Sequence, residues 1–261
     1  MIEADSLTGL LLQCAALAAL GALVALLARL LRLPRAARAL PGPRAGALWA
    51  LLAVGIGWIL VIGLLFGLAG GAPARAPDKG RDVPAGPEDL IGQLMLALVV
   101  AAPVLAVMRR RREPLASAGV SADGLGRSLA VAAFLVAAAV ACWQLAARRA
   151  GAAVPAGLPG GWALAQCAVV GFAEEFAYRG YLQTRLVAWL GTWPGWILAS
   201  VLMAMAHAGH RVAALGMGGG EALLGSAALV PISLFLGFVM LRTGSILAPG
   251  LLHTAINWLE L

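Results

Sequence analysis

The distribution of charge along the chain is the feature that most constrains its fold. Eight runs lack Asp, Glu, Lys and Arg, and each is 17 to 30 residues long. A helix needs roughly 20 apolar residues to cross about 30 Å of hydrocarbon, and spans in lipid must satisfy their own backbone hydrogen bonds. The sequence therefore predicts an all-α, polytopic membrane bundle with about eight transmembrane helices. The runs are Ser6–Ala28, Ala45–Ala74, Leu90–Met108, Ser128–Ala147, Ala150–Ala173, Leu186–His210, Ala222–Leu241 and Thr243–Leu259.

Composition and charge support a membrane protein and argue against a nucleic-acid-binding one. Only 12% of residues are charged, against about a quarter in soluble domains. The net charge of +7 comes from short loops: thirteen basic residues fall in the odd-numbered loops and six in the even-numbered ones. The positive-inside rule then places the odd loops in the cytoplasm and both termini outside. Arginine outnumbers lysine 18 to 1, which suggests a GC-rich bacterial genome and hence the bacterial inner membrane.

Ionisable residues divide the chain into two parts. The spans within residues 1–150 contain almost none, whereas those within residues 151–261 contain several acids and histidines. Such groups are costly in hydrocarbon and normally face a bundle interior or a water-filled cavity. We therefore expect an N-terminal four-span region without motifs and a C-terminal four-span region that carries any chemistry. Two Pro/Gly-rich stretches, Gly70–Pro87 and Ala152–Gly161, are predicted linkers, the first of them a mobile external loop.

Adjacent carboxylates follow the fifth run directly, where Glu174 and Glu175 precede Arg179. On an α-helix Glu175 and Arg179 lie at i,i+4 and face each other. We expect Arg179 to neutralise Glu175, which leaves Glu174, about 100° away around the helix, free for another role.

Histidines and an asparagine supply the remaining polar groups of the C-terminal spans. His207 lies near the end of the sixth run, and His210 is expected at the solvated interface. His253 and Asn257 lie at i,i+4 in the last run and share one helix face. With a rise of about 1.5 Å per residue, Glu174, His207 and His253 all fall at middle depth, so we expect these residues and Asn257 to approach one cavity.

These residues resemble the three motifs of the CPBP family, the CAAX-protease and bacteriocin-processing family of intramembrane proteases. The motifs are Glu174-Glu175-x-x-x-Arg179, Met203-x-x-x-His207 and His253-x-x-x-Asn257, in that order. The stretch from Thr243 to His253 is also similar to the family's last motif. The resemblance covers about residues 160–261, and Met203 stands where the family usually has Phe.

The resemblance implies a division of roles among the motif residues. Glu174 and His207 would activate a water as general base, while His253 and Asn257 would stabilise the oxyanion. Glu175 and Arg179 would be structural support. Alternatively, Glu174, His207 and His253 would be three zinc ligands with water in the fourth position. We favour no cofactor, because a neutral histidine and an asparagine suit oxyanion donation.

The sequence thus predicts an endopeptidase that hydrolyses a peptide bond of a membrane-embedded or lipid-anchored substrate. Buried Glu and His also mark ion paths, so a proton-coupled transporter is an alternative, as is a non-catalytic scaffold or immunity protein. The expected partners are a membrane protein or peptide substrate and the lipid bilayer. For a bacterial chain, a C-terminal sorting tail, a peptide leader or a membrane regulator are better candidate substrates than prenylated CAAX proteins.

Overall fold

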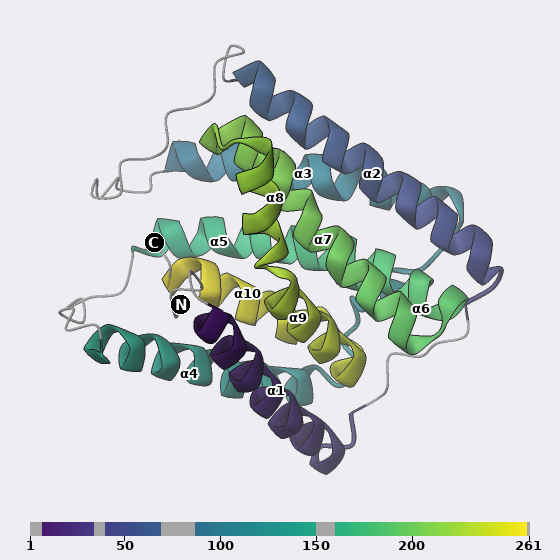
Figure 1. The fold of residues 1–261 in the computed structure, drawn as a ribbon. Coiled ribbons are helices and arrows are strands. Elements are labelled where there is room, and N and C mark those ends of the chain that lie inside the picture. The colour runs from purple at the N-terminus through teal and green to yellow at the C-terminus, as the bar shows by residue number, and fades with distance from the viewer. Residues whose placement is uncertain (1–6, 34–39, 69–86, 150–159, 260–261) are drawn as a thin grey trace.

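The computed structural model describes residues 7–33, 40–68, 87–149 and 160–259, which form a bundle of helices (Figure 1). These ranges contain no β-strand, so the predicted all-α fold is confirmed. The helices in chain order are α1 (Leu7–Leu30), α2 (Pro43–Leu68), α3 (Pro87–Arg110), the 3₁₀ helix η1 (Leu115–Ala118), α4 (Leu125–Arg149), α5 (Gly161–Glu174), the π-helix η2 (Glu175–Gln183), α6 (Thr184–Leu190), α7 (Thr192–Leu215), α8 (Gly219–Ala227), α9 (Val230–Thr243) and α10 (Leu247–Leu259).

Five helices of the described ranges are long and apolar enough to cross a membrane. A sixth is added if α8 and α9, which bend by 41° at a short break, count as one span. The chain is therefore an integral membrane protein, while the count of eight spans stays a prediction. The five helical segments are Gly9–Leu30, Pro43–Gly67, Leu90–Arg110, Leu125–Arg149 and Thr192–Leu215.

The fifth predicted span differs from the observed helix in its position. The run Ala150–Ala173 reflects only where charges are missing, whereas the helix begins at Gly161 and continues without interruption through η2 and α6 to Leu190. The charged residues Glu174, Glu175 and Arg179 therefore lie inside a helix, as the sequence analysis expects. Nearly all of both predicted linkers, residues 70–86 and 152–159, lies outside the described residues.

Two buried apolar clusters place the C-terminal helices between the N-terminal ones. The first cluster joins α2 and α3 to η2, α6 and α7, and includes Ala50, Val104, Leu182, Leu186 and Met203. The second joins α1 and α4 to α9 and α10, and includes Val24, Leu135, Phe235, Val239 and Leu252. In Figure 1, α2 and α3 accordingly lie on one side of α5 and α10, and α1 and α4 on the other. The division into regions 1–150 and 151–261 stays a prediction, and packing contacts cross it on both sides.

Small residues bring α5 and α10 close together. A Cβ atom added at Gly171 of α5 would lie 3.2 Å from the backbone nitrogen of Thr254, and one added at Gly250 of α10 would lie 2.8 Å from the ring of Phe172. Helices in membranes approach closely where such small residues face each other. This crossing sets His253 of α10 against the carboxylates at the end of α5.

A buried arginine fastens α6 to the segment that follows α3. Arg185 donates hydrogen bonds to the carboxylate of Glu113 at 2.9 Å and to the hydroxyl of Ser117 at 2.7 Å. Its guanidinium also lies 4.0 Å from the centre of the Tyr181 ring. Burial acts to raise the pKa of Glu113, but hydrogen bonds from Arg111 and Arg185 outweigh it and hold the pKa below its usual value. Glu113 is therefore ionised in the folded protein and anchors this end of the bundle.

We expect the Glu113 anchor to make stability depend on pH. A carboxyl whose pKa is lowered by folding stabilises the protein above its unfolded value, here 4.5, and this contribution is lost as pH falls through the folded pKa. Thermal unfolding from pH 7 to pH 3 should show this loss in the wild type and less of it in Glu113→Gln. At pH 7 that variant should be less stable by about 3 kcal/mol, since it leaves Arg185 buried without its charge partner. Glu221→Gln, an exposed acid on α8, is the control and should match the wild type; equal pH dependence in Glu113→Gln would contradict the role.

Candidate active site

The site is built around Glu175, the first residue of the π-helix η2, whose side chain is fully buried. One carboxylate oxygen, Oε2, lies 3.5 Å from Nε of Arg179, as the i,i+4 spacing predicts. The other oxygen, Oε1, accepts a hydrogen bond from Nδ1 of His253 at 3.0 Å. Glu175 therefore joins η2 to α10, a contact that the sequence did not predict.

His253 lies between the two adjacent carboxylates. Its Nδ1 is bonded to Glu175, and its Nε2 lies 3.7 Å from Oε2 of Glu174. Since Glu175 is paired with Arg179 and accepts this bond as a carboxylate, Nδ1 carries a proton. The side chain of Glu174 is 23% exposed, against 11% for His253. Glu174 is thus the more accessible acid, and its ion-pair partner among the described residues is His253 rather than an arginine.

Arg179 is held by three helices at once. Besides Glu175, its guanidinium donates to the hydroxyl of Ser233 at 3.0 Å and to the carbonyl of Ser233 at 3.2 Å on α9. It also contacts the sulfur of Met203 on α7. Ser233 in turn donates to the carbonyl of Ser200 at 2.7 Å. Arg179, the arginine of the first motif, therefore links η2 to both α7 and α9. Because α7 contains Met203 and His207, this link holds the second motif close to the first.

His207, the histidine of the second motif, is fixed by its own helix. Its Nδ1 donates to the carbonyl oxygen of Met203 at 3.0 Å, because a carbonyl can only accept. The neutral ring then offers Nε2 as a proton acceptor. No hydrogen bond or ion pair joins His207 to Glu174 in the described ranges. His210 itself is exposed, and its place at the solvated interface stays a prediction.

Asn257 lies one helical turn after His253 on α10 and is partly buried. No side-chain hydrogen bond of Asn257 forms within the described part of the chain. Of the four predicted catalytic residues, the structure thus brings Glu174 and His253 into contact. It leaves His207 and Asn257 on the neighbouring turns of α7 and α10 without a bond to them.

The zinc alternative requires Glu174, His207 and His253 to lie close enough together to bind one metal ion. Within the described residues, no three His, Cys, Asp or Glu side chains form a group that could hold a metal ion. Glu174, His207 and His253 are therefore not gathered as a ligand set. The three cysteines do not contribute one either, since Cys14 and Cys142 are exposed on separate helices and Cys167 is buried.

The sequence analysis missed two features of the site, a π-helix and a bond between distant segments. The helical wheel that we applied assumes an α-helix through Arg179, whereas the segment Glu175–Gln183 is a π-helix. Such segments are rare and frequently lie at functional sites. The motif gave the Glu175–Arg179 pair, but only the position of α10 could reveal the bond from Glu175 to His253.

We predict that Arg179→Ala lowers stability and abundance more than it alters chemistry. The change leaves Glu175 buried without its cation, and breaking such a pair costs about 3–5 kcal/mol. Thermal unfolding and the amount of protein in the membrane measure the loss. Ser233→Ala removes only one neutral partner of the same guanidinium and should cost much less. Normal abundance and stability of Arg179→Ala would refute the structural role.

Comparison with known proteins gives one match. Residues 156–259 match the family model described as "Type II CAAX prenyl endopeptidase Rce1-like". No curated protein matches the chain, and no solved structure does. The matched range includes all three motifs, and residues 1–155 lie outside it. The match confirms the resemblance that the motifs indicated: residues 156–259 are similar to the Rce1-like family model, which is consistent with the CPBP family of intramembrane proteases.

Proposed function

We propose that this protein is an intramembrane endopeptidase in which Glu174 activates a water molecule for attack on a peptide bond. The proposal rests on a difference between two adjacent acids, which differ in burial and in their partners. Glu175 is buried, and each of its carboxylate oxygens has a partner: Oε2 lies beside Arg179, and Oε1 accepts a hydrogen bond from His253. Glu174 keeps only a 3.7 Å contact to His253 and remains partly exposed. A general base needs this combination of an ionised carboxylate and access to water.

The second acceptor in the proposed mechanism is Nε2 of His207. Because Nδ1 of His207 is committed to the Met203 carbonyl, the lone pair lies on the other nitrogen. Glu174 and His207 together would take the proton from the attacking water. The hydroxide would add to the scissile carbonyl, and the proton would pass to the leaving amine as the C–N bond breaks.

His253 and Asn257 would donate hydrogen bonds to the oxyanion of the tetrahedral intermediate. This proposal differs in one feature from the sequence-based expectation, in which the histidine was neutral. A neutral ring whose proton sits on Nδ1, bonded to Glu175, has no proton on Nε2 to donate. We therefore propose that His253 acts as an imidazolium, with its charge balanced by the two flanking carboxylates. Glu175 would then position the ring as well as pair with Arg179.

The substrate class follows from the position of the site within a membrane bundle. A scissile bond must reach Glu174 from lipid or from a lipid-anchored chain, so the substrate is a membrane protein or peptide. The matched family is described as a CAAX prenyl endopeptidase, so a prenylated C-terminal peptide is one direct probe. If the source is bacterial, sorting tails, leaders and membrane regulators are the other candidates.

Comparing membrane peptides from cells that carry wild-type or Glu174→Gln protein tests the proposal. We expect cleavage products to disappear in Glu174→Gln while the variant stays folded, as judged by thermal unfolding. Asn257→Ala should retain weak activity, because loss of one oxyanion donor costs roughly 10²–10³ in rate. Glu221→Gln should behave as the wild type. Function that persists in Glu174→Gln would instead favour the scaffold or transporter alternatives.

The metal-free mechanism predicts that cleavage survives exhaustive chelation. Asn257 is a poor zinc ligand but a suitable hydrogen-bond donor, and it shares a face with His253. The measurement is the rate on a substrate found in the comparison above, before and after dialysis against a chelator. Loss of activity that stoichiometric zinc restores would overturn this mechanism and reassign Glu174, His207 and His253 as ligands.

A further inference from the structure

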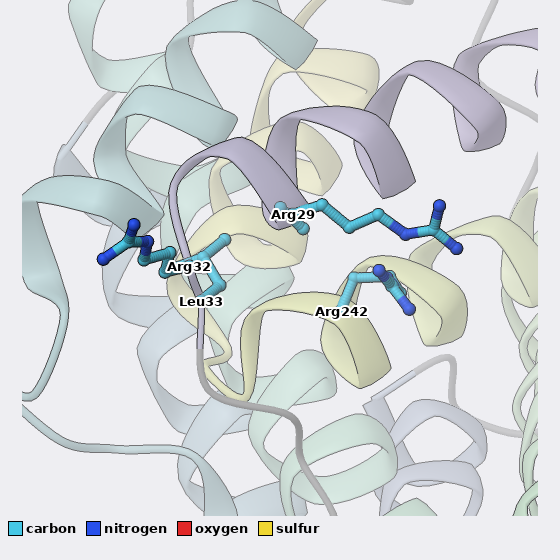
Figure 2. A pocket seen from close by; sticks show the side chains of 5 residues that line it. Arg29, Arg32, Leu33 and Arg242 are labelled. Carbon is cyan, nitrogen blue, oxygen red and sulfur yellow. The ribbon is translucent and has the colours of Figure 1, made fainter.

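A second polar site lies away from the motifs, at the end of α1. A cavity of about 240 Å³ is lined by Ala28, Arg29, Arg32, Leu33 and Arg242. Figure 2 shows Arg29 of α1 and Arg242 of α9 extending toward the same side, while Arg32 extends the other way. A fourth arginine, Arg127 of α4, donates to the backbone carbonyl of Arg32 at 3.1 Å. Three arginines thus line one small cavity, and a fourth lies beside its wall.

These arginines have no acidic partner in the described ranges. Arg242 reaches only the carbonyl of Ala25, at 3.4 Å, and its buried Nε has no hydrogen-bond partner. Neither Arg29 nor Arg32 forms an ion pair with a described residue. Like charges gathered without a counter-charge, together with a buried N–H that lacks an acceptor, indicate a site for an anion.

The shape and lining of the cavity identify the kind of anion. Its volume is below the roughly 300–1,000 Å³ of a pocket for a drug-sized ligand, so only a small group fits. Arginine guanidiniums bind phosphate through paired, charge-assisted hydrogen bonds. The cavity also has apolar walls in Ala28 and Leu33, which are both buried. A phosphate attached to hydrocarbon suits this lining better than a free one.

The surface of α1 beside the cavity favours a lipid. Leu26 lies one turn before Arg29 on the same helix face and is 54% exposed, and the adjacent Leu30 is 71% exposed. These side chains belong to a candidate membrane span, Gly9–Leu30, and the arginines lie at its end. Acyl chains would run along the leucines while the phosphate enters the cavity. Basic pockets at the ends of membrane helices bind anionic head groups in this way.

We propose that the cavity at the ends of α1 and α9 binds the phosphate of an anionic phospholipid, held by Arg29 and Arg242. Occupancy would join α1 to α9 and so support the second apolar cluster. A zwitterionic lipid would bind more weakly, since its ammonium group would face Arg29 and Arg242.

The test measures lipid bound to the purified full-length protein in detergent by native mass spectrometry. Phosphatidylglycerol should bind more tightly than phosphatidylcholine, and Arg29→Gln and Arg242→Gln should each weaken phosphatidylglycerol about tenfold, the loss of one charge-assisted contact. Arg29→Gln is the cleaner variant, because the Arg29 side chain makes no hydrogen bond or ion pair with a described residue. The matched control is Arg112→Gln. Arg112 is an exposed arginine at the end of α3 whose positive φ of 54° resembles the 51° of Arg32, but it does not line the cavity.

Each outcome decides the proposal. Selective loss of phosphatidylglycerol in the cavity variants, with Arg112→Gln unchanged and equal unfolding temperatures without lipid, supports it. Equal binding in all variants overturns it. Inorganic phosphate that stabilises the wild type as strongly as phosphatidylglycerol, through the same arginines, overturns the lipid assignment in favour of a free anion.

Discussion

The double pairing of Glu175 is the interaction on which the rest of the C-terminal bundle depends. A carboxylate with no exposed surface inside a membrane protein is tolerated only when its charge is compensated. Arg179 supplies the countercharge from the same helix, and His253 supplies a proton from α10. Because Arg179 also binds Ser233 on α9 and touches Met203 on α7, one carboxylate determines how four helical segments meet.

Small residues make this arrangement possible. Gly171 and Gly250 let α5 and α10 approach until His253 lies beside both acids. A π-helix begins at Glu175, where the backbone changes from one hydrogen-bonding pattern to another. The charged network and the irregular helix therefore occupy the same turn of the chain. Irregular helical segments of this kind are frequently found at functional sites.

The arginines of this protein have different roles, which depend on their partners in the fold. Arg179 compensates a buried acid within the bundle, and Arg185 ties α6 to Glu113 beyond the end of α3. Arg29 and Arg242 line a cavity with no acid in the described ranges. The positive-inside rule explains why basic residues collect in loops, but the local partners decide which of them stabilise the fold and which remain available to an anion.

The sequence by itself determined the all-α membrane bundle, because uncharged runs of this length have few other solutions. It also determined the Glu175–Arg179 pair, which depends on spacing within one helix. Only the tertiary structure decided that His253 binds Glu175 across 78 residues, that the fifth helix extends from Gly161 to Leu190, and that η2 is a π-helix. The physical reason is the range of the interactions: helix formation and i,i+4 contacts are local, whereas the contact of α10 with α5 arises from packing between distant segments.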